Sequence, residues 1–135
     1  MAKGLQWLEF VEYYLGTRAF NSVFHARVRK AYPPSVGKPG CPPESDVREA
    51  IGETAAAMRI LDNHLEKHDY LAETSAYSFA DAACAPWLHR WASHIDLWGT
   101  ELAPEEFPAI AAYYRRVAAR PAFQQAVGPP GAGFE

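Results

Sequence analysis

The chain has 135 residues, of which 49% are hydrophobic and 21% are charged, a balance typical of one globular domain with a real core. Its formal net charge of −3 leaves no basic excess, which argues against nucleic-acid binding. The apolar runs are too short to span a bilayer and no signal-peptide core is evident, so we expect a cytoplasmic protein and no membrane contact.

The first predicted element is a helix over about residues 4–30, in which Gly16 is expected to weaken or bend the middle. Two stripes of side chains follow helical spacing along it. The first is apolar and is predicted to face the core; it comprises Phe10, Tyr13, Thr17, Phe20 and Phe24. The second turns from apolar to polar, which indicates a surface leading from the core to a cleft or interface; it comprises Trp7, Val11, Tyr14, Arg18, Asn21 and His25.

A connector over residues 32–43 contains five prolines and two glycines, which exclude a helix there. The second helix is predicted over residues 44–68. One face of it is apolar and should be buried; its members are Val47, Ile51, Ala55, Met58, Leu61 and Leu65. His64 and His68 have a spacing that can bind a metal, but no further ligands are evident, so we expect no metal site and assign them to the helix C-terminus.

After a turn over residues 69–77, the third helix should start at Ser78. Ser78 and Asp81 have the spacing of a capping box, so both are interpreted as structural. The small residues that follow predict a central, buried helix, which Pro86 should kink. Trp87 and Trp91 add apolar area on one side. They are expected to pack in the core, with ligand contact as the alternative, and His94 continues their stripe.

The fourth helix should start near Pro104 and end before Pro121, where a short helix through Val127 begins. Its predicted buried stripe comprises Phe107, Ile110, Ala111, Tyr114, Val117 and Ala118. The fold class is therefore all-α, a bundle of about four main helices plus a short C-terminal helix. The folded domain should cover residues 1–127, and residues 128–135 should form a poorly ordered tail.

Three stretches in this order resemble the all-helical C-terminal domain of the glutathione S-transferase superfamily. They are LQWLEFVEYYL from Leu5, YSFADAACAPWLHRW from Tyr77 and FPAIAAYYRRVAARPAFQQAV from Phe107. The resemblance implies a helical bundle that supplies a hydrophobic substrate pocket and part of a dimer interface. Nothing here resembles the N-terminal thioredoxin-like domain, which binds glutathione and activates its thiolate. We therefore expect no cofactor in this chain alone, and glutathione only if such a domain is supplied elsewhere.

The resemblance places the pocket between the first and third helices. The predicted substrate-binding residues are Tyr14, Arg18, Asn21, Trp87 and Trp91. The alternative for the first three is that Tyr14 packs in the core while Arg18 and Asn21 face solvent. No catalytic residue of the family can be carried over. His89 and His94 are candidates for acid–base catalysis, although a helical histidine beside tryptophans more often packs through hydrogen bonds. The surface that the absent domain would cover should be partly apolar, with exposed aromatic side chains such as Trp7 and Tyr14.

Four hypotheses follow. The leading one is a stand-alone domain that binds a hydrophobic small molecule or a protein partner, including a second copy or a thioredoxin-like protein, in this cleft. The second is a cofactor-free enzyme of isomerase, lyase or cyclase type that reuses the pocket, with His89, His94 or Arg18 as acid–base groups. The third is an interaction module, and the fourth is the substrate-pocket half of a longer glutathione transferase.

Overall fold

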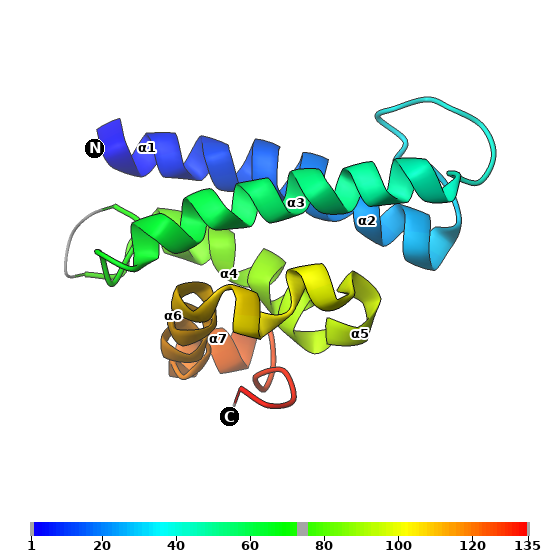
Figure 1. The fold of residues 1–135 in the computed structure, drawn as a ribbon. Helices are drawn as coiled ribbons and strands as arrows, with labels where there is room; N and C mark the ends of the chain where they lie inside the picture. Colours follow the sequence, from blue (N-terminus) through cyan, green and yellow to red (C-terminus); the bar gives the residue numbers. More distant parts are fainter. Residues whose placement is uncertain (1, 73–75, 135) are drawn as a thin grey trace.

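The computed structural model describes residues 2–72 and 76–134, and every regular element within these ranges is helical. The predicted all-α fold is confirmed. The first helix is built from four consecutive segments that run on without a break (Figure 1): α1 (Ala2–Glu9), η1 (Phe10–Phe20), α2 (Asn21–Phe24) and η2 (His25–Arg29). It ends where predicted, because Lys30 adopts a left-handed conformation with φ 53°.

The buried face of the first helix differs from the predicted one. Residues 10–20 and 25–29 form wide π-helical turns, and the amide of Asn21 bonds to the carbonyl of Gly16 five residues earlier. Wide turns hold more residues than the 3.6 of an α-helix, and one row of buried positions recurs at every fourth residue, at Val11, Leu15, Ala19 and Val23. Gly16, Phe20 and Ala26 are buried beside this row. Of the predicted core stripe, Phe20 is buried, whereas Thr17 is exposed and Tyr13 is 70% exposed.

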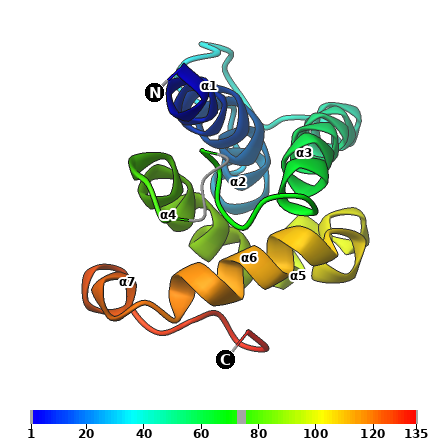
Figure 2. The same ribbon diagram turned by 90° about the vertical axis from the view of Figure 1, so that its left-hand side faces the viewer.

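Helix α3 (Glu44–Leu65) confirms the predicted second helix and its apolar face, all of whose members are buried. It ends at Leu65, so His64 lies in its last turn and His68 lies beyond it. The connector before α3 forms no regular helix, as its prolines require. α3 and the next long helix, α4 (Phe79–Ser93), lie on either side of the first helix (Figure 2).

Helix α4 begins at a capping box formed by Ser78 and Asp81. Both oxygens of the Asp81 carboxylate accept hydrogen bonds. Oδ2 accepts from the amide of Ser78 at 2.8 Å and from its hydroxyl at 2.9 Å, and Oδ1 accepts from the amide of Leu71 at 3.0 Å. The carboxylate thus ties the preceding turn to α4. Residues 73–75, within the turn predicted over 69–77, lie outside the described residues.

The remaining helices are short except for α6. They are α5 (Ile95–Trp98), η3 (Thr100–Leu102), η4 (Pro104–Glu106), α6 (Pro108–Ala118) and α7 (Pro121–Ala126). The fourth predicted helix is thus divided. Pro104 opens a single 3₁₀ turn, and the α-helix starts at Pro108, because both prolines suit a first-turn position. Helix α6 crosses beneath α3 and α4 and contacts both, and its predicted apolar stripe is buried.

The C-terminal segment packs on the bundle, whereas its proline and glycine content predicted a poorly ordered tail. Phe134 is only 3% exposed and lies against the rings of Tyr114 and Trp91, with centroids 5.1 and 5.9 Å away. The amide of Gly131 donates a hydrogen bond to the Tyr114 hydroxyl. One aromatic anchor therefore holds a segment whose composition alone favours disorder.

Candidate functional site

The space between the first helix and α4 is filled at its centre. A Cβ atom added to Gly16 would lie 2.2 Å from the indole of Trp87, so only a glycine permits this approach. Near the start of both helices, Phe79 lies against Gly4 in the same way, 3.2 Å from where a Cβ would stand. The cleft that we expected between the first helix and α4 is therefore occupied by protein side chains at these two positions.

The predicted substrate-binding residues do not converge on one site. Arg18 lies 5.9 Å from the ring centroid of Tyr14 and 3.7 Å from a carboxylate oxygen of Glu53 on α3. Trp91 is fully buried, and its indole N–H donates to the carbonyl of Leu102 at 2.8 Å. Trp91 therefore belongs to the core, which was the favoured interpretation of its position in the sequence.

Asn21 and Trp87 meet instead around an arginine that sequence reasoning did not single out. The Arg90 guanidinium lies 5.4 Å from the ring centroid of Trp87 and 4.6 Å from that of Phe24, and it donates to Asn21 Oδ1 at 3.3 Å. The available signal was that Arg90 follows Trp87 by three residues, a spacing that places both on one helix face. We call Asn21, Phe24, Trp87 and Arg90 the arginine cluster.

Tyr14 belongs to a separate surface, the aromatic face, which lies between the first helix and α3. It comprises Trp7, Phe10, Tyr13, Tyr14 and Ile60. Its rings are in contact: Trp7 meets Phe10 edge-on at 5.4 Å between centroids, and Phe10 stacks on Tyr14 at 5.6 Å. Tyr13 is 70% exposed and Ile60 is 51% exposed. The aromatic face also holds shallow pockets of about 500 and 270 Å³.

His89 lies in a hydrogen-bond chain between Ser93 and Tyr114. Nδ1 is 2.8 Å from the Tyr114 hydroxyl, and Nε2 is 3.3 Å from Ser93 Oγ. The Tyr114 oxygen already accepts a hydrogen bond from the amide of Gly131, so the Tyr114 hydroxyl is best placed to donate its proton to His89 Nδ1. In neutral His89 the ring hydrogen is then on Nε2. Partial burial, followed by the nearby His94, lowers the pKa of His89 and favours this neutral form. His89 therefore offers a proton to Ser93 and is not placed to deprotonate it.

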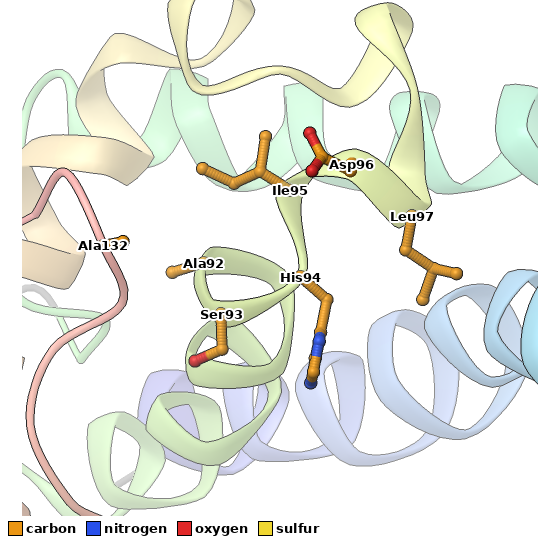
Figure 3. Close-up of a pocket in the computed structure, with 7 residues that line it drawn as sticks. All are labelled: Ala92, Ser93, His94, Ile95, Asp96, Leu97 and Ala132. Carbon is orange, nitrogen blue, oxygen red and sulfur yellow. The ribbon is translucent and has the colours of Figure 1, made fainter.

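His94 lines an open pocket of about 510 Å³ at the corner between α4 and α5. The C-terminal segment contributes Ala132 to its wall. His94 and Asp96 are the titratable residues of this pocket, and they point away from the corner in opposite directions (Figure 3). They do not converge on one point, as an acid–base pair acting on a shared substrate atom would need to do.

The rings of His64, in the last turn of α3, and of His68, just beyond it, pack on one another. His64 and His68 stack at 4.6 Å between centroids, and His64 also lies 4.2 Å from Trp7. The described residues contain no group of three or more side chains suited to hold a metal ion. In the same part of the chain, no helix combines the length and apolar character needed to cross a bilayer.

The order and packing of the helices are those of a glutathione-transferase-type helical domain. Comparison of the chain with known proteins agrees with this class. Residues 23–121 match the family model described as glutathione S-transferase, C-terminal domain, and the chain belongs to this family. A curated relative is the disulfide-bond oxidoreductase YfcG of Escherichia coli (strain K12). It is 34% identical over 76 residues, which cover 56% of this chain and 32% of that protein.

Two solved structures share the fold. Glutathione S-transferase III in its apo form is 26% identical with a TM-score of 0.69, and the match covers 93% of this chain and 53% of that one. The glutathione transferase URE2P6 from Phanerochaete chrysosporium, in complex with oxidized glutathione, is 25% identical with a TM-score of 0.72, and the match covers 92% and 50%. This chain thus spans about half the length of these solved relatives.

Proposed function

We propose that this glutathione-transferase-type helical domain is a binding domain, and that its aromatic face contacts a protein partner. The observation that carries the proposal is Tyr13, 70% exposed on a surface whose neighbouring rings already contact one another. Aromatic residues are enriched in protein interfaces, and contiguous apolar surface on a folded domain marks a site of association. The proposed binding surface therefore lies on the α3 side of the first helix, not in the seam with α4.

The partner that the aromatic face suits best is a second copy of the chain. A twofold dimer brings the same surface of both copies together, which requires a self-complementary patch. The five residues of the aromatic face are uncharged, and Glu9 is the one charged side chain that lines its two pockets, so like-charge repulsion between two copies is confined to Glu9. A thioredoxin-like protein is the other candidate partner for the same face.

Size-exclusion chromatography with light scattering tests the proposal over a range of protein concentrations. The chain should elute as a dimer, and Tyr13→Ser and Ile60→Ser should shift it towards a monomer because they place hydroxyls in the buried centre of the interface. Val28→Ser is the matched control, since Val28 and Ile60 are both 51% exposed and Val28 lies outside the aromatic face. A monomer at every concentration, or equal effects of Ile60→Ser and Val28→Ser, would reject the second copy as partner.

A hydrophobic small molecule is the second candidate ligand of the aromatic face. Its shallow pockets, of about 500 and 270 Å³, are lined by Gln6, Trp7, Phe10, Tyr13 and Ile60 among others. The fluorescent probe 8-anilinonaphthalene-1-sulfonate should then bind the monomer, and Phe10→Ala should weaken that binding. We also propose that the chain alone does not bind glutathione. Isothermal titration calorimetry checks this, and tight binding of glutathione would overturn it.

A further inference from the structure

Arg90 is a half-buried cation with few partners. A guanidinium group carries five N–H donors. Within residues 2–72 and 76–134, Asn21 Oδ1 is the hydrogen-bond acceptor found for Arg90, at 3.3 Å, and no carboxylate forms an ion pair with it. The rings of Phe24 and Trp87 flank the group at 4.6 and 5.4 Å. These rings restrict its orientation without using its in-plane donors.

Two further basic residues lie near Arg90. His25 and Arg29 are four residues apart on the neighbouring segment η2. The ring of His25 meets that of Phe24 edge-on at 5.9 Å between centroids, and Arg90 packs on the same Phe24 ring. Partial burial lowers the pKa of His25, and the charges of Arg29 and Arg90 lower it further, so the neutral form of His25 is favoured. The positive charge here is therefore that of the two arginines, and it creates a positive local potential beside apolar surface. The sign of this local potential is opposite to that of the whole chain, whose formal net charge is −3.

We propose that Arg90, with Arg29 and His25, binds the carboxylate of a small aromatic acid whose ring packs on Phe24 or Trp87. A carboxylate is the anion whose two oxygens match the fork of a guanidinium, and charge-assisted hydrogen bonds of this kind are the strong ones. The two flanking rings supply an apolar wall directly beside that fork, so a ligand with a charged end and an aromatic end can satisfy both surfaces at once.

This binding site is independent of the proposed dimer. The aromatic face lies between the first helix and α3, whereas Arg90 belongs to α4 and meets the first helix through Asn21 and Phe24. The Tyr13→Ser variant should therefore lose self-association and keep carboxylate binding. Substitution of Arg90 should weaken carboxylate binding and leave self-association unchanged. Failure of one proposal can therefore be distinguished from failure of the other.

Calorimetric titration of the full chain with benzoate tests the inference, with benzamide as a neutral probe of the same shape. Benzoate should bind more tightly than benzamide, and Arg90→Met should weaken benzoate binding by about tenfold or more while leaving benzamide unaffected. The matched control is Arg59→Met, because the Arg59 guanidinium also lies over a ring, 6.0 Å from that of Phe107, and belongs to α3. Binding of benzoate should also weaken as salt is added.

Arg29→Gln gives a second, milder test because Arg29 is exposed and its loss should not disturb packing. It should weaken benzoate binding less than Arg90→Met does, with unchanged far-ultraviolet circular dichroism. Equal affinities for benzoate and benzamide would overturn the inference. So would an equal loss of affinity in the Arg59→Met protein, or the absence of any heat or amide chemical-shift change at Arg90 up to the solubility limit of benzoate.

Discussion

The hydroxyl of Tyr113 donates a 2.6 Å hydrogen bond to Oδ1 of Asp81, and both side chains are fully buried. The same carboxylate accepts from the amide of Leu71 and from both the amide and the hydroxyl of Ser78. Asp81 therefore joins three parts of the chain: the turn before α4, α4 itself and α6. These hydrogen bonds satisfy a carboxylate that would be very unfavourable in the core without them.

Substitution of Asp81 by asparagine should destabilise the fold by about 2–4 kcal/mol. An amide group of the same shape presents two N–H donors where the surrounding groups are themselves donors, so at least one buried contact becomes repulsive or unpaired. Urea unfolding measures the change in the free energy of unfolding. The control is Asp96→Asn, at an exposed carboxylate of α5, which should change it by less than about 0.5 kcal/mol. Equal effects of the two substitutions would contradict the structural role of Asp81.

Stability should fall at alkaline pH, and Tyr113 should contribute to that fall. Burial raises the pKa of Tyr113 far above its ordinary value near 10.0, and the negative charge of Asp81, which accepts the hydrogen bond of Tyr113, raises it further. The folded state thus holds the phenolic proton more tightly than the unfolded chain does. The stabilisation is fully present below about pH 10 and is lost as pH rises above the unfolded pKa.

Urea unfolding of the wild type and of Tyr113→Phe, repeated from neutral to alkaline pH, measures this contribution. The Phe variant should be less stable at neutral pH, because it loses the hydrogen bond to Asp81, and its free energy of unfolding should decline less steeply above about pH 10. Tyr77 and Tyr114 keep some decline in the variant, since burial raises the pKa of both. Parallel curves for the two proteins would show that the ionisation of Tyr113 is not linked to folding.

The contact between Gly16 and Trp87 predicts opposite effects for two glycine-to-alanine substitutions. Gly16→Ala should destabilise by about 1–3 kcal/mol, because its Cβ would overlap the indole at 2.2 Å and the packed helices must move apart. Gly52→Ala on α3 should stabilise by up to about 1 kcal/mol, since Gly52 is exposed, helical and has nothing within 4 Å of an added Cβ. Thermal unfolding compares the two. A stabilising Gly16→Ala would mean that the seam with α4 is looser than this contact indicates.

Most of the fold could be predicted because its signals are local. The prolines of the connector exclude a helix there, and an apolar stripe at regular helical spacing predicts α3. The capping box of Ser78 and Asp81 marks the start of α4. The buried face of the first helix could not be predicted in the same way. Its wide turns change the spacing of buried positions. No local residue pattern predicts that a backbone amide will bond to the carbonyl five residues earlier.

The candidate sites were less predictable, because they depend on contacts between distant residues. Asn21 and Trp87 were expected to face a pocket, but their meeting point, Arg90, depends on how the first helix packs against α4. The close contact of Gly16 with Trp87, 71 positions along the chain, likewise depends on how the first helix packs against α4. The aromatic face was anticipated through Trp7 and Tyr14, although its most exposed member, Tyr13, had been assigned to the core.

The C-terminal segment should contribute measurable stability through its one aromatic anchor. Phe134→Ala should lower the free energy of unfolding by about 2 kcal/mol, because Phe134 is 3% exposed and its ring packs on Tyr114 and Trp91. Phe79→Ala is the control, since Phe79 is 46% exposed and should cost less. Amide hydrogen exchange gives a second measurement: the Gly131 amide, bonded to Tyr114, should lose protection in the Phe134→Ala protein. An unprotected Gly131 amide in the wild type would instead show that the segment does not stay on the bundle in solution.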